Sequence, residues 1–314
     1  MERFRAGLDA LISPDARIGL AVSGGPDSLA LLLLAAAARP SMIEAASVDH
    51  GLRKGSHEEV AFVALLCERL GVPHAVLTAR WSEIPETAIQ ERARRERYRL
   101  LSYWTEERAL DALATAHHAD DQAETLLMRL NRGSGVRGLA GMRGRSITPG
   151  NHVRLLRPLL GWRRADLRQI CADAGLTPVV DPSNADERFE RVRIRSALGN
   201  AEWLDTAAVA RSAAHLADAD TALDWAARIE WGRSVQERMD DIRYRPGDAP
   251  AEIVRRVVSR AVRKLATEGE SELRGNELDR LLASLAMGEI STLRGVRCSG
   301  GKEWRFSPAS PRRA

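Results

Sequence analysis

The 314-residue sequence has few cysteines, few aromatic residues and no long apolar run. Its cysteines, Cys67, Cys171 and Cys298, stand alone, and no CxxC or Cys/His pair has the spacing of a metal site. This argues against a disulfide framework and against a zinc or iron–sulfur centre. No segment reaches the ~20 apolar residues that a membrane span needs, and the first residues lack the apolar core of a secretory signal. We therefore expect a cytoplasmic protein without a membrane partner.

Lysine is scarce as well. Only Lys54, Lys264 and Lys302 stand among the 47 basic residues, so arginine supplies nearly all of the positive charge, and the formal net charge is +4. Arginine pairs with phosphate in a fixed bidentate geometry, which suits a nucleic-acid partner. A genome-wide codon bias would give the same count, so the charge alone leaves both interpretations open.

Short apolar runs alternate with segments of helical periodicity in the first part of the chain. The runs that predict strands are Ile18–Val22, Ile43–Val48, His74–Leu77 and Ala112–Ala116. The segments that predict helices are Ser28–Ala38, Ser56–Leu70, Thr87–Glu107, Asp120–Arg132 and Arg163–Ala174. Strands and helices in this alternating order are typical of an α/β domain built on a parallel sheet.

The pattern changes after about residue 200. Alanine-rich helical segments follow, over Trp203–Ile229, Ala251–Ala266 and Glu277–Ala286, and short strand-like runs close the chain within Leu293–Phe306. Before this change, the Gly- and Arg-rich segment Gly133–Asn151 predicts a basic loop outside the core. We expect an α/β nucleotide-binding and catalytic domain over residues 1–200 and a smaller, mostly helical domain over residues 201–314.

The segment IGLAVSGGPDS runs from the first expected strand into the first expected helix. A loop in this position lies at the carboxyl edge of a parallel sheet, where backbone amides bind anions. Gly24 and Gly25 let the backbone approach a ligand closely, and Ser23 and Ser28 add hydroxyl donors. A tight turn with a helix cap would use the same residues. Neither a Walker loop nor a GxGxxG fingerprint stands at this turn.

Two acids accompany this predicted phosphate site. Asp27 lies inside the loop, where its charge would repel phosphate unless a magnesium ion bridged the two. Asp49 follows the second expected strand in SVDHGLR and therefore reaches the same edge of the sheet. An aspartate at the end of a strand is also a common turn former.

The fourth expected strand ends in TAHHADDQAET. Within it His117, Asp121 and Glu124 recur at spacings of four and three, so they share one face of the helix that follows. Such triplets also occur on ordinary solvated helix faces. Here Leu126, Leu127 and Leu130 supply a separate apolar stripe. The polar face is therefore expected to line a cleft at the strand edge.

The order of these motifs resembles one family. SGGPDS matches the SGGxDS loop of ATP pyrophosphatases, which cut ATP between its α- and β-phosphates. Over roughly residues 15–198 the chain is similar to the tRNA(Ile)-lysidine synthetase family. The similarity lies in six motifs and their order: SGGxDS, VDHGLR, AHHxxDxxET, RGSGxxGLxGM, RPLL and DPSN. The resemblance implies an AMP-forming ligase that uses ATP to adenylate the wobble cytidine of an isoleucine tRNA and then replaces AMP with L-lysine.

The resemblance also implies site residues. ATP would be bound by Ser23, Gly24, Gly25, Pro26, Asp27, Ser28 and Asp49, with Mg²⁺ on Asp27. L-lysine would be bound by Arg97, Asp121 and Glu124. The catalytic residues would be Asp27, His117 and Asp121. The basic segments Arg129–Arg145 and Arg188–Arg195, which include Arg132, Arg137, Arg191 and Arg195, would contact phosphates of the tRNA(Ile) anticodon loop, although ordinary solvated arginine faces have the same composition. The family is also compatible with a homodimer.

Alternatives remain open for two of these residues and for the whole function. A histidine at a helix start, such as His117, is as often a hydrogen-bonded cap, and Arg97 also fits a surface ion pair. A tRNA thiolase could share the ATP loop, but that chemistry commonly needs paired cysteines. A catalytically silent RNA-binding protein with the same fold would be expected to lose the loop acids or glycines, which are present here.

Overall fold

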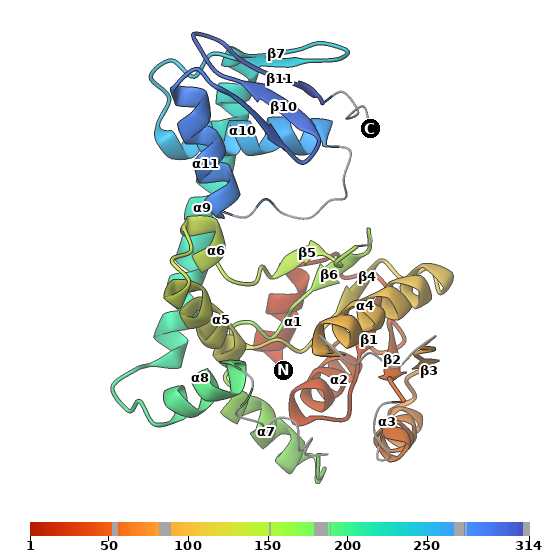
Figure 1. Cartoon of the computed structure of the whole chain (residues 1–314). Helices are drawn as coiled ribbons and strands as arrows, with labels where there is room; N and C mark the ends of the chain where they lie inside the picture. The colour runs from red at the N-terminus through yellow and green to blue at the C-terminus, as the bar shows by residue number, and fades with distance from the viewer. Residues whose placement is uncertain are drawn as a thin grey trace. The chain divides into compact units, whose positions relative to one another are not determined.

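The computed structural model describes residues 1–51, 56–81, 89–150, 152–178, 188, 190–266, 273 and 275–309. The chain divides into two compact units, Met1–His215 and Leu216–Ala314 (Figure 1). The division falls inside helix α9 (Thr206–Ser234), C-terminal to the boundary expected near residue 200. The DPSN motif and Arg53 of SVDHGLR lie outside the described residues. Among the described helices, none has the length and apolar character to cross a membrane.

A six-stranded sheet forms the centre of the first unit, in the order β3-β2-β1-β4-β6-β5. Its strands are β1 (Ile18–Ala21), β2 (Ile43–Asp49), β3 (His74–Thr78), β4 (Ala112–Ala114), β5 (Arg145–Ile147) and β6 (Arg154–Leu156). All neighbours pair in parallel except β5, which runs antiparallel to β6. The predicted α/β fold with a parallel sheet is confirmed.

Helices cover both faces of this sheet (Figure 1). They are α1 (Glu2–Asp9), α2 (Pro26–Ala38), α3 (Ser56–Leu70), α4 (Ile89–Glu107), α5 (Ala119–Asn131), α6 (Val136–Leu139), α7 (Arg164–Asp173) and α8 (Glu190–Gly199). Because side chains alternate along a strand, each strand feeds two cores. Leu156 packs with α1, α2, α3 and α7, whereas the adjacent Leu155 packs with α4 on the opposite face.

Gly19 in β1 explains how closely α4 lies against the sheet. A Cβ atom at Gly19 would meet the ring of Trp104 at 2.6 Å, so only glycine leaves room for this indole. Trp104 is 3% exposed and packs with Leu101 and Leu113. The contact holds α4 on the sheet, with the N-terminal half of the helix, which carries Arg97, near the carboxyl edge of the strands.

Of the segment Gly133–Asn151, predicted to be a loop, the described residues 133–150 include regular structure. They contain α6 and strand β5, which extends the sheet, and Ala140 is fully buried. Gln122 of α5 holds the segment, because its Oε1 accepts a hydrogen bond from Met142 N–H (2.6 Å) and its Nε2 donates to the Met142 carbonyl (2.9 Å). The prediction of a loop outside the core is wrong here, since tertiary hydrogen bonds leave no periodic signal in the segment itself.

The second unit combines helices with a five-stranded antiparallel sheet in the order β7-β8-β11-β10-β9. Its elements after α9 are β7 (Val235–Glu237), β8 (Ile242–Tyr244), α10 (Ala251–Leu265), α11 (Gly275–Ala286), β9 (Ile290–Leu293), β10 (Val296–Ser299) and β11 (Trp304–Pro308). The predicted helices are present. The sequence pattern indicated only the last strands of the sheet, because β7 and β8 have three residues each.

Candidate active site

The loop between β1 and α2 has the geometry of an anion site. Gly24 has a φ of +83°, a left-handed conformation that favours glycine, although a Cβ there would find ordinary contact distances of 3.6 Å. The Ser23 N–H donates to Ser28 Oγ (3.1 Å), and Ser28 Oγ donates to the Gly25 carbonyl (2.9 Å). These bonds fix the loop ahead of the α2 N-terminus, where backbone N–H groups and the helix dipole favour an anion.

Asp27 lies in the first turn of α2 with one carboxylate oxygen unused. Its Oδ1 atom is buried and has no hydrogen-bond partner among the described residues, and its side chain is 26% exposed. The other oxygen, Oδ2, lies 3.4 Å from Nε2 of His118, which precedes α5. A buried carboxylate oxygen without a partner is costly, so this atom is available to a cation.

His118 joins the loop to the start of α5. The side chain is 1% exposed, and its ring nitrogens lie 3.4–3.5 Å from carboxylate oxygens of Asp27, Asp120 and Asp121. Burial alone would lower the pKa of His118, but the close carboxylates of Asp120, Asp27 and Asp121 outweigh it and raise the pKa to about 9. His118 is therefore protonated at neutral pH and neutralises part of this acid cluster.

Backbone groups orient the acids around His118. Asp121 Oδ2 accepts a hydrogen bond from the His118 N–H (3.1 Å), which caps the N-terminus of α5. Asp120 Oδ2 accepts one from the Arg164 N–H (2.8 Å) at the start of α7. Burial opposes ionisation of Asp120, but the bonds from His118 and Arg164 N–H prevail and lower its pKa to about 2. Asp120 is thus ionised, and backbone groups of two helices hold Asp120 and Asp121 in place.

The neighbouring His117 faces charges of the opposite sign. Its Nδ1 lies 2.9 Å from Thr115 Oγ1 at the end of β4. Burial, followed by the positive charges of Arg157, Arg94, Arg97 and Arg191, lowers the pKa of His117 to about 2. His117 is therefore neutral, while the adjacent His118 is charged. The two histidines mark a boundary between a positive side and a negative side of the site.

Arg97 belongs to the positive side. It lies in α4 beside Tyr98, with its guanidinium carbon 5.6 Å from the centroid of that ring, and Arg94 lies 5.0 Å from the same centroid. Burial lowers the pKa of Arg97, and the like charge of Arg94 adds to this effect. Within the described ranges, Arg97 pairs with no carboxylate, so the alternative of a surface ion pair finds no partner there.

Two arginines of α8 reach the acids of α5. Arg191 donates from Nε to Glu124 Oε2 (2.7 Å) and from Nη2 to Asp121 Oδ1 (3.1 Å). Arg195 donates from Nε to Glu124 Oε1 (2.6 Å). The Glu124 side chain is only 1% exposed, and both arginines lower its pKa against the opposing effect of burial. Four residues predicted to bind two different substrates therefore contact one another.

The other predicted residues are more scattered. Asp49 is 2% exposed at the end of β2; its Oδ1 accepts a hydrogen bond from the Gly51 N–H (2.9 Å), and its Oδ2 lies 3.0 Å from His57 Nδ1. Arg132 and Arg137 are exposed in the segment after α5, and Arg132 forms an ion pair with Glu190 of α8. Asp49 thus shares the carboxyl edge with the loop but has protein partners there.

Sequence reasoning missed three polar residues of this site, namely His118, Asp120 and Arg157. The doublets His117–His118 and Asp120–Asp121 were visible in TAHHADDQAET, but spacing alone does not choose between Asp120 and Asp121, since both stand three or four residues from His117 and from Glu124. His118 contributes from the position that caps the helix, outside the predicted helix face.

A magnesium ion fits Asp27 only together with substrate oxygens. No group of three or more His, Cys, Asp or Glu side chains in the described part of the chain is placed to hold a metal by itself. Magnesium is usually bound by one or two carboxylates together with phosphate oxygens and water. The unpartnered Asp27 Oδ1, next to a phosphate-type loop, matches that mode of binding.

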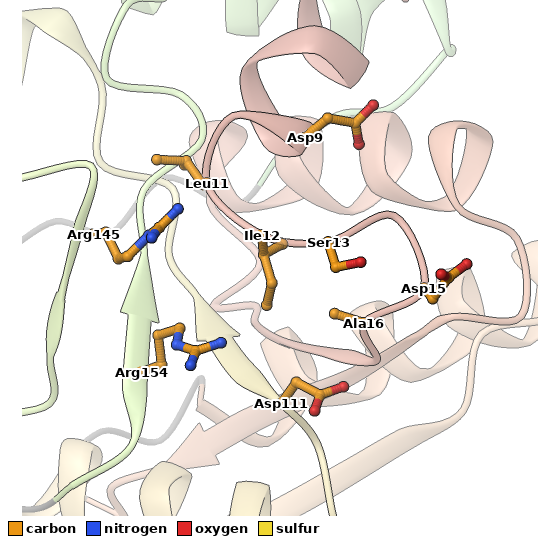
Figure 2. Close-up of a pocket in the computed structure, with 9 residues that line it drawn as sticks. All are labelled: Asp9, Leu11, Ile12, Ser13, Asp15, Ala16, Asp111, Arg145 and Arg154. Carbon is orange, nitrogen blue, oxygen red and sulfur yellow. The ribbon is translucent and has the colours of Figure 1, made fainter.

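A separate pocket lies at the opposite, amino edge of the sheet. Figure 2 shows Arg145 and Arg154 lining it together with Asp9, Asp15 and Asp111, and its volume is about 490 Å³. Asp111 directly precedes β4, and Arg154 is the first residue of β6. Because these strands are parallel to β1, the pocket lies at the edge where the strands begin, and the loop at Gly24 lies at the edge where they end.

Comparisons with known proteins agree with this geometry. Residues 2–202 match the family model of the PP-loop domain. The chain is 49% identical to a tRNA(Ile)-lysidine synthase of Novosphingobium aromaticivorans, over 99% of this chain and 94% of that protein. It is 42% identical to a tRNA(Ile)-lysidine synthase of Zymomonas mobilis, over 95% of this chain and 90% of that protein.

A solved structure shares the fold at low identity. The U34-tRNA thiolase NcsA of Methanococcus maripaludis, described with its [4Fe–4S] cluster, aligns over 68% of this chain and 77% of its own, with a TM-score of 0.56 and 18% identity. In this chain Cys67, Cys171 and Cys298 lie in α3, α7 and β10, and all three are buried as free thiols. Burial raises their pKa values to about 11, 11 and 12. These cysteines have neither the grouping nor the ionisation of cluster ligands.

Proposed function

The chain belongs to the tRNA(Ile)-lysidine synthase family, with a PP-loop domain as its ATP-using part, and from this we propose that it forms lysidine in an isoleucine tRNA. It is an ATP-dependent ligase that modifies tRNA. The observation that carries the proposal is the junction of two motifs, since Asp27 of the glycine loop lies 3.4 Å from His118 at the head of the acid-bearing helix α5.

The proposed reaction has two steps. The C2 carbonyl oxygen of the wobble cytidine attacks the α-phosphorus of ATP, the bond between the α- and β-phosphates breaks, and pyrophosphate leaves. The ε-amine of L-lysine then attacks C2, the C2–O bond breaks, AMP leaves with that oxygen, and the amine gives up a proton. Activation is needed because a carbonyl oxygen is a poor leaving group, whereas AMP is a good one.

The loop Ser23–Ser28, which includes Pro26 at the start of α2, would bind the phosphates of ATP. Support comes from the left-handed Gly24, from the internal bonds of Ser23 and Ser28, and from the free N–H groups of the first helical turn. Asp27 would hold magnesium through its unpartnered Oδ1. Bound magnesium would neutralise phosphate charge, and Asp49 would bind at the nucleotide side of the same edge.

Asp121 and Glu124 would hold the ammonium groups of lysine. In the free protein these carboxylates are already neutralised by Arg191 and Arg195. A lysine ammonium would therefore take over part of the hydrogen bonding that Arg191 makes to Asp121. Arg97, which has no carboxylate partner among the described residues, would bind the lysine carboxylate.

His117 would act at the reacting phosphate or as the base that receives the amine proton. In the free protein its pKa of about 2 makes it a weak base. The arginines that lower this pKa are the groups that bound substrate anions would neutralise, so its basicity would rise in the substrate complex. Its bond to Thr115 would orient the ring.

The tRNA would approach across the segment after α5. Arg132 and Arg137 are exposed and would contact phosphates, which gives affinity and orientation. Arg191 and Arg195 would serve RNA only after leaving Glu124. The wobble base must be splayed out to reach the site, as single-stranded RNA recognition usually requires. L-lysine as the amino acid and a homodimeric assembly are parts of this proposal.

Product analysis tests the function directly. Purified protein is incubated with ATP, magnesium, L-lysine and an isoleucine tRNA that carries an unmodified wobble cytidine. We expect release of pyrophosphate that depends on the tRNA, and a tRNA mass increase equal to lysine minus water. Asp27→Asn should abolish both. Asp15→Asn, in the pocket at the opposite edge of the sheet, is the matched control and should leave both unchanged. Equal turnover with any amino acid, or no tRNA dependence, would contradict the proposal.

A further inference from the structure

Arg157 stands directly after β6 with part of its guanidinium unused. The residue is 9% exposed, and its Nη1 donates to the Arg143 carbonyl (2.7 Å) and to Ser146 Oγ (2.9 Å). Its Nε atom is buried and has no hydrogen-bond partner among the described residues. Nε–H and the adjacent Nη2–H group form the fork with which arginine binds a carboxylate side-on.

The hydroxyl of Tyr98 also lacks a hydrogen-bond partner among the described residues. Tyr98 is 1% exposed in α4, and its oxygen is buried without a partner in the described ranges. It lies close enough to Arg97 and Arg157 to act on the pKa of each guanidinium by charge and by hydrogen bonding, but no contact among the described residues meets the full geometry of a hydrogen bond to the Tyr98 oxygen or to Arg157 Nε. A buried phenol and a buried guanidinium N–H, both left unsatisfied, are costly unless a ligand completes their hydrogen bonding.

This cluster also has uncompensated positive charge. Arg94, Arg97 and Arg157 form no ion pair with any carboxylate that the structure describes. The nearby His117 is neutral, so it does not balance this positive charge. Elsewhere in the site, arginines are paired, as Arg191 is with Glu124. Of the three, Arg157 is buried, Arg97 is half-buried and Arg94 is exposed. A buried guanidinium without a counter-charge is costly unless a ligand balances it, so the cluster is suited to an oxyanion.

The order of the sheet separates this cluster from the phosphate loop. The loop follows β1, the acid cluster follows β4, and Arg157 follows β6, so that β4 lies between the strands that carry the two anion sites. Phosphates of ATP would occupy the site after β1. An oxyanion after β6 therefore comes most naturally from the second small substrate, whose ammonium groups face the acids after β4.

We infer that Arg157 and the Tyr98 hydroxyl, together with Arg97, form an oxyanion subsite that binds the α-carboxylate of the amino-acid substrate. Neither Arg157 nor Tyr98 follows from the helix-face spacing that pointed to the acid pair. The inference rests on the proposed function, since it gives that substrate a second carboxylate-binding residue. A phosphate group of the nucleotide has the same oxyanion chemistry, so the test must distinguish the two sources.

Steady-state kinetics with Arg157→Gln make the test. With saturating tRNA, the KM for L-lysine should rise about tenfold or more, as expected for loss of a charged hydrogen bond, while the KM for ATP stays within about twofold. L-lysinamide lacks the carboxylate, and its inhibition constant against lysine should be the same in the variant and the wild type. Arg154→Gln, at the other end of β6, is the matched control and should resemble the wild type.

Other outcomes would overturn the inference. A rise in the KM for ATP with an unchanged KM for lysine would assign the subsite to a nucleotide phosphate. Equal losses for lysine and lysinamide would show a general distortion of the site. Tyr98→Phe removes one hydroxyl with little risk to folding, and it should raise the KM for lysine severalfold without changing the inhibition constant of lysinamide. A wild type without lysine-dependent activity would instead refute the proposed function itself.

Discussion

At the scale of single residues, two adjacent histidines take opposite charge states. His117 faces arginines and is held neutral, whereas His118 faces three carboxylates and is held protonated. The chain turns from the end of β4 into α5 at this point, so consecutive side chains point to different surroundings. One dipeptide therefore lies between positively charged and negatively charged surroundings in the candidate site.

The charge of His118 predicts how stability depends on pH. Because its pKa is raised from 6.5 to about 9, the protonated ring stabilises the folded state fully below pH 6.5, and this contribution is lost as the pH rises through about 9. A shift of this size corresponds to about 3 kcal/mol. Urea unfolding in EDTA should show the unfolding free energy falling between pH 6.5 and 9.5.

A histidine variant outside the site serves as the control for this pH dependence. His118→Gln should flatten this pH dependence, while His152→Gln, at an exposed position before β6, should keep it. A wild-type unfolding free energy that is constant from pH 6.5 to 9.5 would show that His118 carries no such charge.

The sequence predicts the local geometry of some residues of the candidate site and not that of others. The glycines of SGGPDS have a strict backbone requirement, and Gly24 indeed adopts a left-handed φ. His118 and Arg157 carry no comparable signal, because their surroundings come from distant segments. The pairing of Arg191 with Glu124 joins positions 67 residues apart, which no local pattern could indicate.

At the scale of elements, the contact between α5 and α8 depends on one buried carboxylate. Glu124 accepts hydrogen bonds from Arg191 and Arg195, and these bonds hold α8 against α5. Glu124→Gln would remove the charge, which leaves Arg195 without this carboxylate and Arg191 with Asp121 alone among the described residues. The unfolding free energy should fall by about 3 kcal/mol or more, as for other broken buried ion pairs.

A surface pair supplies the control for this prediction. Glu91 and Arg95 in α4 form an exposed i,i+4 ion pair at 3.5 Å, and Glu91→Gln should change the unfolding free energy by less than about 0.5 kcal/mol. Guanidinium chloride unfolding of both variants makes the comparison. If Glu124→Gln were as stable as the wild type, the carboxylate would not hold these helices together.

The long, regular elements were predictable, as was the three-residue β4, whose apolar run is five residues long, whereas the other three-residue strands were not. The first strands and helices begin and end within one or two residues of the expected positions, because burial enforces their periodicity. Strands β5 and β6 have three residues each, too few for a periodic signal, and they are recognisable only by their pairing with the rest of the sheet. The clamp of Gln122 on Met142 is likewise a tertiary feature.

At the scale of the whole molecule, the site draws on segments spread over much of the first unit. The β1 loop, α4, the start of α5, the residue after β6 and α8 all contribute side chains, and the parallel strand order brings three of these segments to one edge. The sequence predicted this edge correctly, since carboxyl ends of parallel strands meet there. The second unit has its own hydrophobic core, built from α10, α11 and its sheet.

The central claim is that the loop Ser23–Ser28 and the acids of α5 form one site for ATP and lysine. A crystal structure with a non-hydrolysable ATP analogue, magnesium and L-lysine tests it most directly. We expect the triphosphate on the amides of the loop and a lysine ammonium within hydrogen-bond distance of Asp121 or Glu124. A nucleotide bound elsewhere, with the loop empty, would contradict it.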